Sequence, residues 1–126
     1  MKIVALEKKS EWLTQSLIEA GFSEDNEMDV KAGNTYEVHA VVVWSDSVFY
    51  QIVGESEVIS WVPSTLFQVV ETSIPEDWII NSLDLEVPLV IGPNFVSASK
   101  EAYSEMVELV PTKVREFKTR IASLER

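Results

Sequence analysis

The chain has 126 residues, of which 46% are hydrophobic and 10% aromatic, and it carries a formal net charge of -11 at pH 7. This size and composition predict one globular domain with its own core and exclude a disordered acidic tail. No cysteine is present, which excludes disulfides and thiol chemistry, and no stretch approaches the ~20 apolar residues of a membrane-spanning helix. We therefore expect a cytoplasmic protein without a cofactor or a membrane partner.

The N-terminal region is expected to hold one short helix followed by an acidic loop. The helix should run from Ser10 to about Ala20 and end at Gly21, because four apolar residues recur at helical spacing: Trp12, Leu13, Leu17 and Ala20. Residues 23–34 are rich in acids and poor in apolar side chains, which predicts a solvated loop. Its Asp25, Glu27 and Asp29 have the alternate spacing of a calcium loop, but the glycine and the final bidentate acid of such a loop are missing.

From Thr35 the hydrophobic period changes to two, which predicts strands at residues 35–44, 48–53, 57–62 and 66–71. Residues 78–80 and 87–91 are further candidates. In the first strand His39 falls on the more polar face and is expected at the surface, whereas the core face consists of Tyr36, Val38, Ala40, Val42 and Trp44. Short strands joined by tight turns predict a small barrel or a strongly bent antiparallel sheet.

Two helices are expected after Gly92-Pro93. The first begins near Ser97 or Ser99 and is broken by Pro111, and the second carries an apolar stripe of Val114, Phe117, Ile121 and Leu124. Basic residues on its other faces are expected to compensate acids of the barrel, within the molecule or between subunits: Lys113, Arg115, Lys118 and Arg120. The predicted architecture is one α+β domain, with an N-terminal helix and acidic loop at 1–34, a β-barrel core at 35–92 and a helical extension at 93–126.

The segment from Ile59 to Val70 resembles the end of an SH3-like barrel, in which a strand reaches Pro-Ser, makes a helical turn and continues as the closing strand. Here Pro63-Ser64 is followed by Leu66, where SH3 domains place an aromatic residue of their proline-peptide groove. A second resemblance rests on the order of four motifs before a helical tail: Tyr36-x-Val38, Tyr50-x-Ile52, Trp61-x-Pro63-Ser64-x-Leu66-Phe67-x-Val69 and Ile74-Pro75-x-Asp77-Trp78. In this order the chain is similar to small acidic bacterial proteins, some of them immunity proteins that neutralise secreted toxins. That resemblance implies a toxin inhibitor and assigns no functional residue.

The negative charge is concentrated in the middle of the chain. Residues 32–99 contain no lysine or arginine but nine carboxylates: Glu37, Asp46, Glu55, Glu57, Glu71, Glu76, Asp77, Asp84 and Glu86. Such a field attracts cationic partners and repels phosphate backbones and anionic lipid. We therefore expect a basic protein as the partner, with a toxin domain as the leading candidate, and neither nucleic acid nor membrane.

Six residues are the candidate partner-binding set: Asp46, Glu55, Glu57, Glu76, Asp77 and Trp78. An aromatic side chain among carboxylates has the usual composition of an interface hot spot, because it can insert into a partner while the acids pair with arginine and lysine. The alternative for Trp78 is that it covers the end of the barrel. Trp12 is expected to hold the first helix on the barrel, and Trp44 or Trp61 to lie in the core.

Two other function classes remain open. One is a structural or regulatory adaptor that self-associates, or docks on a larger complex, through its apolar helix stripes, so that either a monomer or a homodimer is compatible with the sequence. The other is an enzyme that uses Glu37 and His39 or a pair of carboxylates, which would require a pocket where these groups converge with shifted pKa values.

Overall fold

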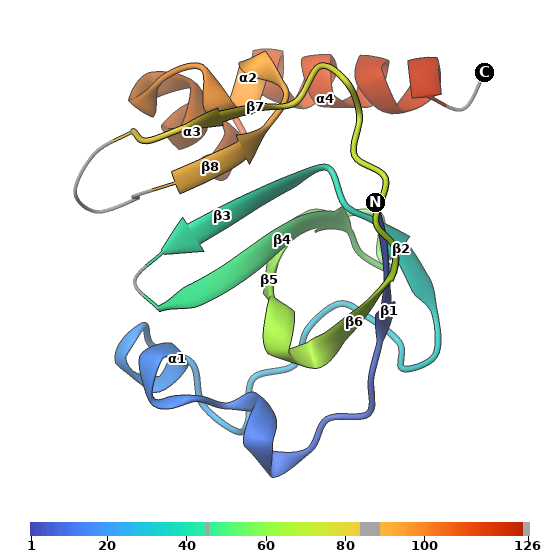
Figure 1. Ribbon diagram of the computed structural model, residues 1–126, viewed down its shortest axis with the longest axis vertical. Helices are drawn as coiled ribbons and strands as arrows, with labels where there is room; N and C mark the ends of the chain where they lie inside the picture. Colours follow the sequence, from blue (N-terminus) through green and yellow to red (C-terminus); the bar gives the residue numbers. More distant parts are fainter. Residues whose placement is uncertain (45, 84–88, 125–126) are drawn as a thin grey trace.

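The computed structural model describes residues 1–44, 46–83 and 89–124 (Figure 1). The elements within these residues are, in chain order, β1 (Lys2–Ala5), the 3-10 turn η1 (Ser10–Trp12), α1 (Gln15–Glu19), β2 (Thr35–Glu37), β3 (Ala40–Trp44), β4 (Ser47–Val53), β5 (Ile59–Pro63), the 3-10 turn η2 (Ser64–Leu66), β6 (Phe67–Glu71), β7 (Ile79–Asn81), β8 (Leu89–Gly92), α2 (Asn94–Ser97), α3 (Lys100–Val107) and α4 (Pro111–Leu124). The protein is therefore α+β, as the sequence predicts.

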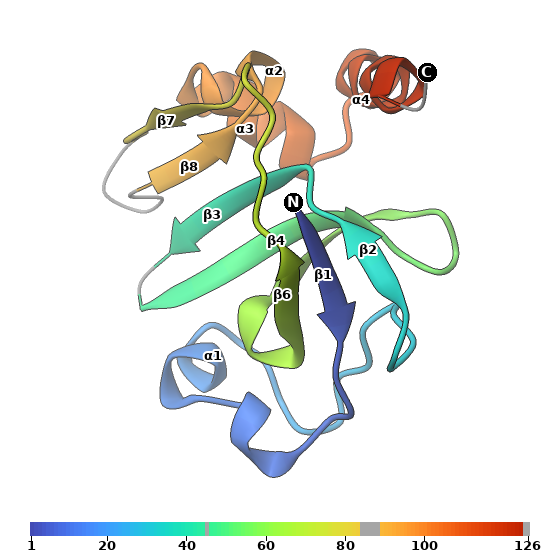
Figure 2. The same ribbon diagram turned by 45° about the vertical axis from the view of Figure 1, so that its right-hand side comes forward.

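The described strands form two antiparallel sheets. One has three strands in the order β2-β1-β6, and the other has five in the order β5-β4-β3-β8-β7. Residues 38 and 39 join β2 of the first sheet to β3 of the second, so one continuous segment passes between the sheets (Figure 2). Among the described strands β5 pairs only with β4 and β6 only with β1, and no closed barrel results.

The helices cover the molecule at opposite ends. In both views α2, α3 and α4 lie together at one end and α1 lies at the other (Figures 1 and 2). The main core cluster includes Ile3, Leu17, Ile52 and Val90, and a second cluster is formed by Ala40, Val96, Met106 and Phe117 under the C-terminal helices. Because α2 to α4 pack on one face of the five-stranded sheet, its central strand β3 is buried on both faces from Ala40 to Val42.

The first predicted strand was expected to bury one face and to expose the other, and this expectation is wrong. Val38, Ala40 and Val42 are buried, as predicted, but Val41 of the opposite face is buried too. His39, expected at the surface, is only 7% exposed, because the C-terminal helices cover the face that looked polar in the sequence. Trp44, by contrast, is 37% exposed at the end of β3 and does not lie in the core, while Trp61 is half-buried and contacts both clusters.

The N-terminal region differs most from the expectation. Residues 2–5, for which no strand was predicted, form β1 at the centre of the three-stranded sheet. The expected helix is divided into η1 and α1, because Thr14 rather than Ser10 caps α1 by accepting a hydrogen bond from the Leu17 N–H (3.3 Å). Trp12 and Leu17 are nevertheless buried against the main core, as their spacing predicts.

The C-terminal elements agree more closely with the sequence, although three helices, α2 to α4, form where two were predicted. The Ser99 hydroxyl caps α3 by accepting from the Ala102 N–H (3.0 Å), and Pro111 begins α4. The strand candidates at 78–80 and 87–91 correspond to β7 and β8, except that residues 87 and 88 lie outside the described residues. So do Ser45, Arg126 and the acids Asp84 and Glu86 of the central stretch.

The acidic loop is not wholly solvated, because Asp29 is packed on the β4–β5 turn. The Asp29 carboxylate accepts hydrogen bonds from the Ser56 N–H (3.0 Å) and hydroxyl (3.0 Å), and its carbonyl accepts from the Glu55 N–H (2.8 Å). Gly54 makes room for this contact, since a Cβ added there would lie 2.6 Å from the Asp29 carbonyl oxygen. The contact fixes the acidic loop against the hairpin that carries Glu55 and Glu57.

We expect Gly54→Ala to lower the free energy of unfolding by about 1–3 kcal/mol, the usual cost of forcing extra atoms into a packed site. The measurement is urea unfolding of the variant beside Ser104→Ala, which changes an exposed position of α3 and should leave the midpoint unchanged. Equal midpoints for both variants would contradict the close contact between Gly54 and Asp29.

Candidate functional site

The six predicted partner-binding residues lie at three places. Asp46 is exposed in the β3–β4 turn, Glu55 and Glu57 lie in the β4–β5 turn, and the remaining three lie between β6 and β7. Seven residues of β4 separate the first two turns, which places them roughly 20 Å apart. Glu57 and Pro75 line one cavity, so the β4–β5 turn and the β6–β7 connection border the same depression. The structure thus brings five of the six toward one end and leaves Asp46 at the other.

The two acids of the β4–β5 turn have different surroundings. The Glu55 carboxylate accepts hydrogen bonds from the Tyr36 hydroxyl and from the Asn34 amide nitrogen (2.7 Å), and these bonds lower its pKa. Glu57 adopts a left-handed backbone conformation with φ 61°, and its side chain is exposed. Glu57 makes no ion pair or side-chain hydrogen bond with the described residues, so its charge is available to a partner.

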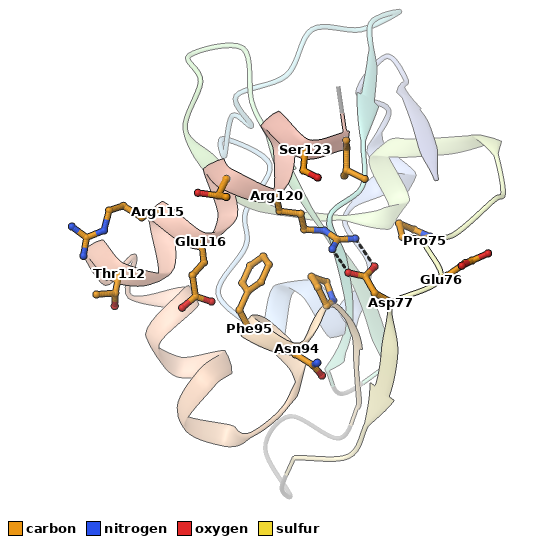
Figure 3. A pocket seen from close by; sticks show the side chains of 13 residues that line it. Pro75, Glu76, Asp77, Asn94, Phe95, Thr112, Arg115, Glu116, Arg120 and Ser123 are labelled. Atoms are coloured by element: carbon orange, nitrogen blue, oxygen red, sulfur yellow. Dashed lines mark hydrogen bonds and ion pairs between the residues drawn. The ribbon is translucent and has the colours of Figure 1, made fainter. Parts of the chain in front are cut away.

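Asp77 is paired within the molecule. The Arg120 guanidinium of α4 donates two hydrogen bonds to the Asp77 carboxylate and lowers the pKa of Asp77 (Figure 3). The side chain of Arg120 is 14% exposed and that of Asp77 is 59% exposed. This contact holds the β6–β7 connection against α4. Arg120 of the last helix thus compensates the charge of Asp77, one of the predicted partner-binding acids. The neighbouring Glu76 is exposed and points away from Arg120 (Figure 3).

Trp78 is half-buried and packs against the main core cluster, and its indole N–H has no hydrogen-bond partner among the described residues. This placement of Trp78 agrees with the alternative that it covers the end of the sheets. The insertion of Trp78 into a partner stays a prediction. The apolar side chains of this region that are more than half exposed are Val70, Ile74 and Ile80, the last 69% exposed. Sequence reasoning did not select them, because alternation alone does not show which face a neighbouring strand leaves uncovered.

A first cavity of about 1130 Å³ lies between α4, the start of α2 and the β6–β7 connection (Figure 3). Pro93 and Phe95 provide apolar surface, Glu116 lies beside Phe95, and the Asp77–Arg120 pair closes one side. Cations and carboxylates alternate around it, so its charge selects neither an anion nor a cation.

A second cavity, of about 850 Å³, lies between α4 and the strands. One wall is the inner face of α4, from Phe117 to Leu124, and the other is formed by β2, the β4–β5 turn and the ends of β4 and β5. Its apolar lining comes from Val53, Ile59, Pro75, Phe117, Ile121 and Leu124, and its polar lining from Lys2, Thr35, Tyr36, Glu37, His39, Glu57 and Lys118.

His39 is the most buried ionisable side chain of this second cavity. Its ring lies edge-on to Phe117, with 4.9 Å between the ring centroids. Burial, followed by the nearby positive charges of Arg120 and the Met1 amino group, lowers the pKa of His39 to about 4. The imidazole is therefore neutral at pH 7, and it makes no side-chain hydrogen bond with the described residues.

The same geometry addresses the enzyme alternative. Glu37, at the end of β2, and His39, in the link to β3, line one cavity, but the Glu37 carboxylate faces the Met1 amino group at 3.5 Å. No described side chain orients the imidazole, and a base with a pKa near 4 takes up protons weakly at neutral pH. The pair therefore lacks the hydrogen-bonded arrangement of a general base.

No protein-family model, curated protein or solved structure matches the chain. The described residues include no helix long and apolar enough to cross a bilayer. They also include no group of three or more histidine, aspartate or glutamate side chains arranged to hold a metal ion.

Proposed function

We propose that this protein is an acidic, non-catalytic binding domain whose partner is a basic protein. The observation that carries the proposal is the exposure of Asp46, Glu57 and Glu76, none of which forms an ion pair or side-chain hydrogen bond with the described residues. Among the described residues, Asp77 is the only one of the six that pairs with a cation. Unpaired surface carboxylates on a chain of net charge -11 attract cationic partners and accelerate their encounter.

The segment from Val70 to Ile80 adds apolar contact area to this charge. Val70, Ile74 and Ile80 are more than half exposed, and Glu76 and Asp77 lie between Ile74 and Ile80 in the sequence. Stable interfaces combine an apolar centre, which slows dissociation, with charged residues that set orientation and association rate. This combination favours the β6–β7 connection, with the adjacent β4–β5 turn, as the binding face.

We further propose that the domain is related to SH3-like barrels and acts as an immunity protein that occludes a basic toxin domain in the cytoplasm. Two features support the relation: the continuous β2–β3 segment contributes to both sheets, and Pro63 ends β5 before η2 leads into β6. Occlusion needs no catalytic group, and the absence of cysteine suits a reducing compartment.

The test is capture of the partner from a lysate at low salt, followed by association rates measured by stopped-flow fluorescence at increasing ionic strength. We expect Glu57→Lys combined with Glu76→Lys to slow association about 10-fold or more, toward the rate of an unsteered encounter. Asp46→Lys is the matched control for Glu57→Lys alone, since the two single variants change the net charge equally at opposite ends of β4, and Asp46→Lys should slow association less than Glu57→Lys. An association rate that responds to neither salt nor charge reversal would refute the proposal.

The exposed apolar side chains are also compatible with the alternative function, an adaptor that self-associates. Ile80 lies on β7, an edge strand among the described strands, and such an edge can pair with another chain. Sedimentation velocity separates the alternatives, because a stable homodimer that Ile80→Lys dissociates, with no affinity for basic proteins, would favour the adaptor.

A further inference from the structure

The second cavity contains a polar group without a partner. His39 is only 7% exposed and belongs to the lining of the cavity, and its ring nitrogens make no hydrogen bond with the described residues although protein atoms do not enclose them. Here the open space beside the ring can hold a molecule that bonds to it.

The charges around this cavity differ from those of the protein as a whole. Lys2 and Lys118 line it together with Glu37 and Glu57, and Glu37 already faces the Met1 amino group. Arg120 lies close enough to act electrostatically on His39. In a chain of net charge -11 this cavity is therefore a place where cations are at least as numerous as carboxylates, and an anion is not repelled there.

The remaining lining is apolar. Phe117, Ile121 and Leu124 of α4 face Val53 and Ile59 across the cavity, and a volume of about 850 Å³ falls within the roughly 300–1,000 Å³ of small-molecule sites. Such sites are mostly apolar, with a few polar groups that fix the orientation of the ligand.

We propose that this cavity binds a small amphipathic carboxylate, with its apolar body against the inner face of α4 and its carboxylate hydrogen-bonded to His39. The ring N–H of His39 donates to the carboxylate, and Lys118 and Lys2 at the rim add electrostatic attraction. A ligand with a cationic head cannot accept the ring N–H of His39; it can only donate to the other ring nitrogen, in the presence of Lys2 and Lys118. This inference does not depend on the binding of a basic protein.

The test compares three probes of equal chain length, octanoate, octanol and octylammonium, by titration calorimetry of the full chain. We expect octanoate to bind most tightly, and we expect its binding to raise the pKa of His39, followed by the NMR shift of the ring protons. Octanol should leave the His39 titration almost unchanged. Equal affinity for octanoate and octylammonium, or no octanoate binding below its micelle concentration, would overturn the proposal.

Two variants separate the roles of the residues. His39→Phe keeps a ring beside Phe117 but removes the donor, and it should weaken octanoate binding about 10-fold, the effect of losing one hydrogen bond to a charged group. Lys118→Glu should also weaken it, whereas Lys113→Glu, on the same helix but outside the cavity lining, should not. Both lysine variants keep the buried face of α4 intact, so the test survives if His39→Phe does not fold. Unchanged octanoate affinity in Lys118→Glu would count against the site.

Discussion

Replacing Phe117 with alanine is expected to lower the free energy of unfolding by about 3–5 kcal/mol, the usual cost of deleting a buried phenylalanine. Phe117 is 1% exposed and is the only side chain of α4 that is fully buried among the described residues. Its ring contacts His39 on one side and Phe95 of α2 on the other, with 6.4 Å between the two phenyl centroids. Since small domains are stabilised by only about 5–15 kcal/mol in total, this loss should detach α4 or unfold the protein.

Urea unfolding and amide hydrogen exchange of α4 measure this effect. Leu124→Ala is the matched control, because Leu124 belongs to the same apolar stripe but is 51% exposed, and it should change the free energy of unfolding little. If Phe117→Ala leaves the rest of the domain folded, the amides of α4 should exchange much faster than those of β3 and β4. Similar stability losses in the two variants would mean that Phe117 does not anchor the helix.

The hairpins and the last helix could be predicted from the sequence because their signals are local. Alternation from Thr35 onward predicts β2 to β4, Pro63 ends β5, and the spacing of Phe117 and Ile121 identifies the inner face of α4. The β1 strand could not be predicted in this way. It has only four residues, and it is stabilised by pairing with β2 and β6, both distant in the sequence.

The site was predictable in charge but not in geometry. Asp77 and Arg120 are 43 residues apart and on different elements, so no sequence pattern indicates that they pair. His39 is buried because α2 to α4 cover its side of the sheet. The alternation of residues in a strand does not show that helices will cover that face. By contrast, the placement of Glu37 and His39 on one cavity follows from their alternate positions in the chain, since residues two apart share a face of an extended segment.

The second large effect is a dependence of stability on pH that originates at His39. The unfolded chain should bind a proton at His39 near pH 6.5, whereas the folded chain does so only near the lowered pKa of about 4. Between these values the unfolded state holds more protons than the native state, so the free energy of unfolding falls as the pH falls. From pH 7.5 to pH 5 this single group should remove about 2 kcal/mol of stability, and the loss is complete below about pH 4.

A comparison with His39→Gln isolates this contribution, because glutamine carries no charge at any pH while the carboxylates titrate alike in both proteins. The lowered pKa values of Asp77, Glu55 and Glu71 act at lower pH, where those carboxylates take up protons, and they cancel in the difference. Urea unfolding at a series of pH values should therefore give curves that diverge below pH 6.5, with the native protein losing stability faster than the variant. Parallel curves would show that His39 titrates normally, and hence that α4 and Phe117 do not keep it from water. They would also remove the buried, unpartnered imidazole on which carboxylate binding depends.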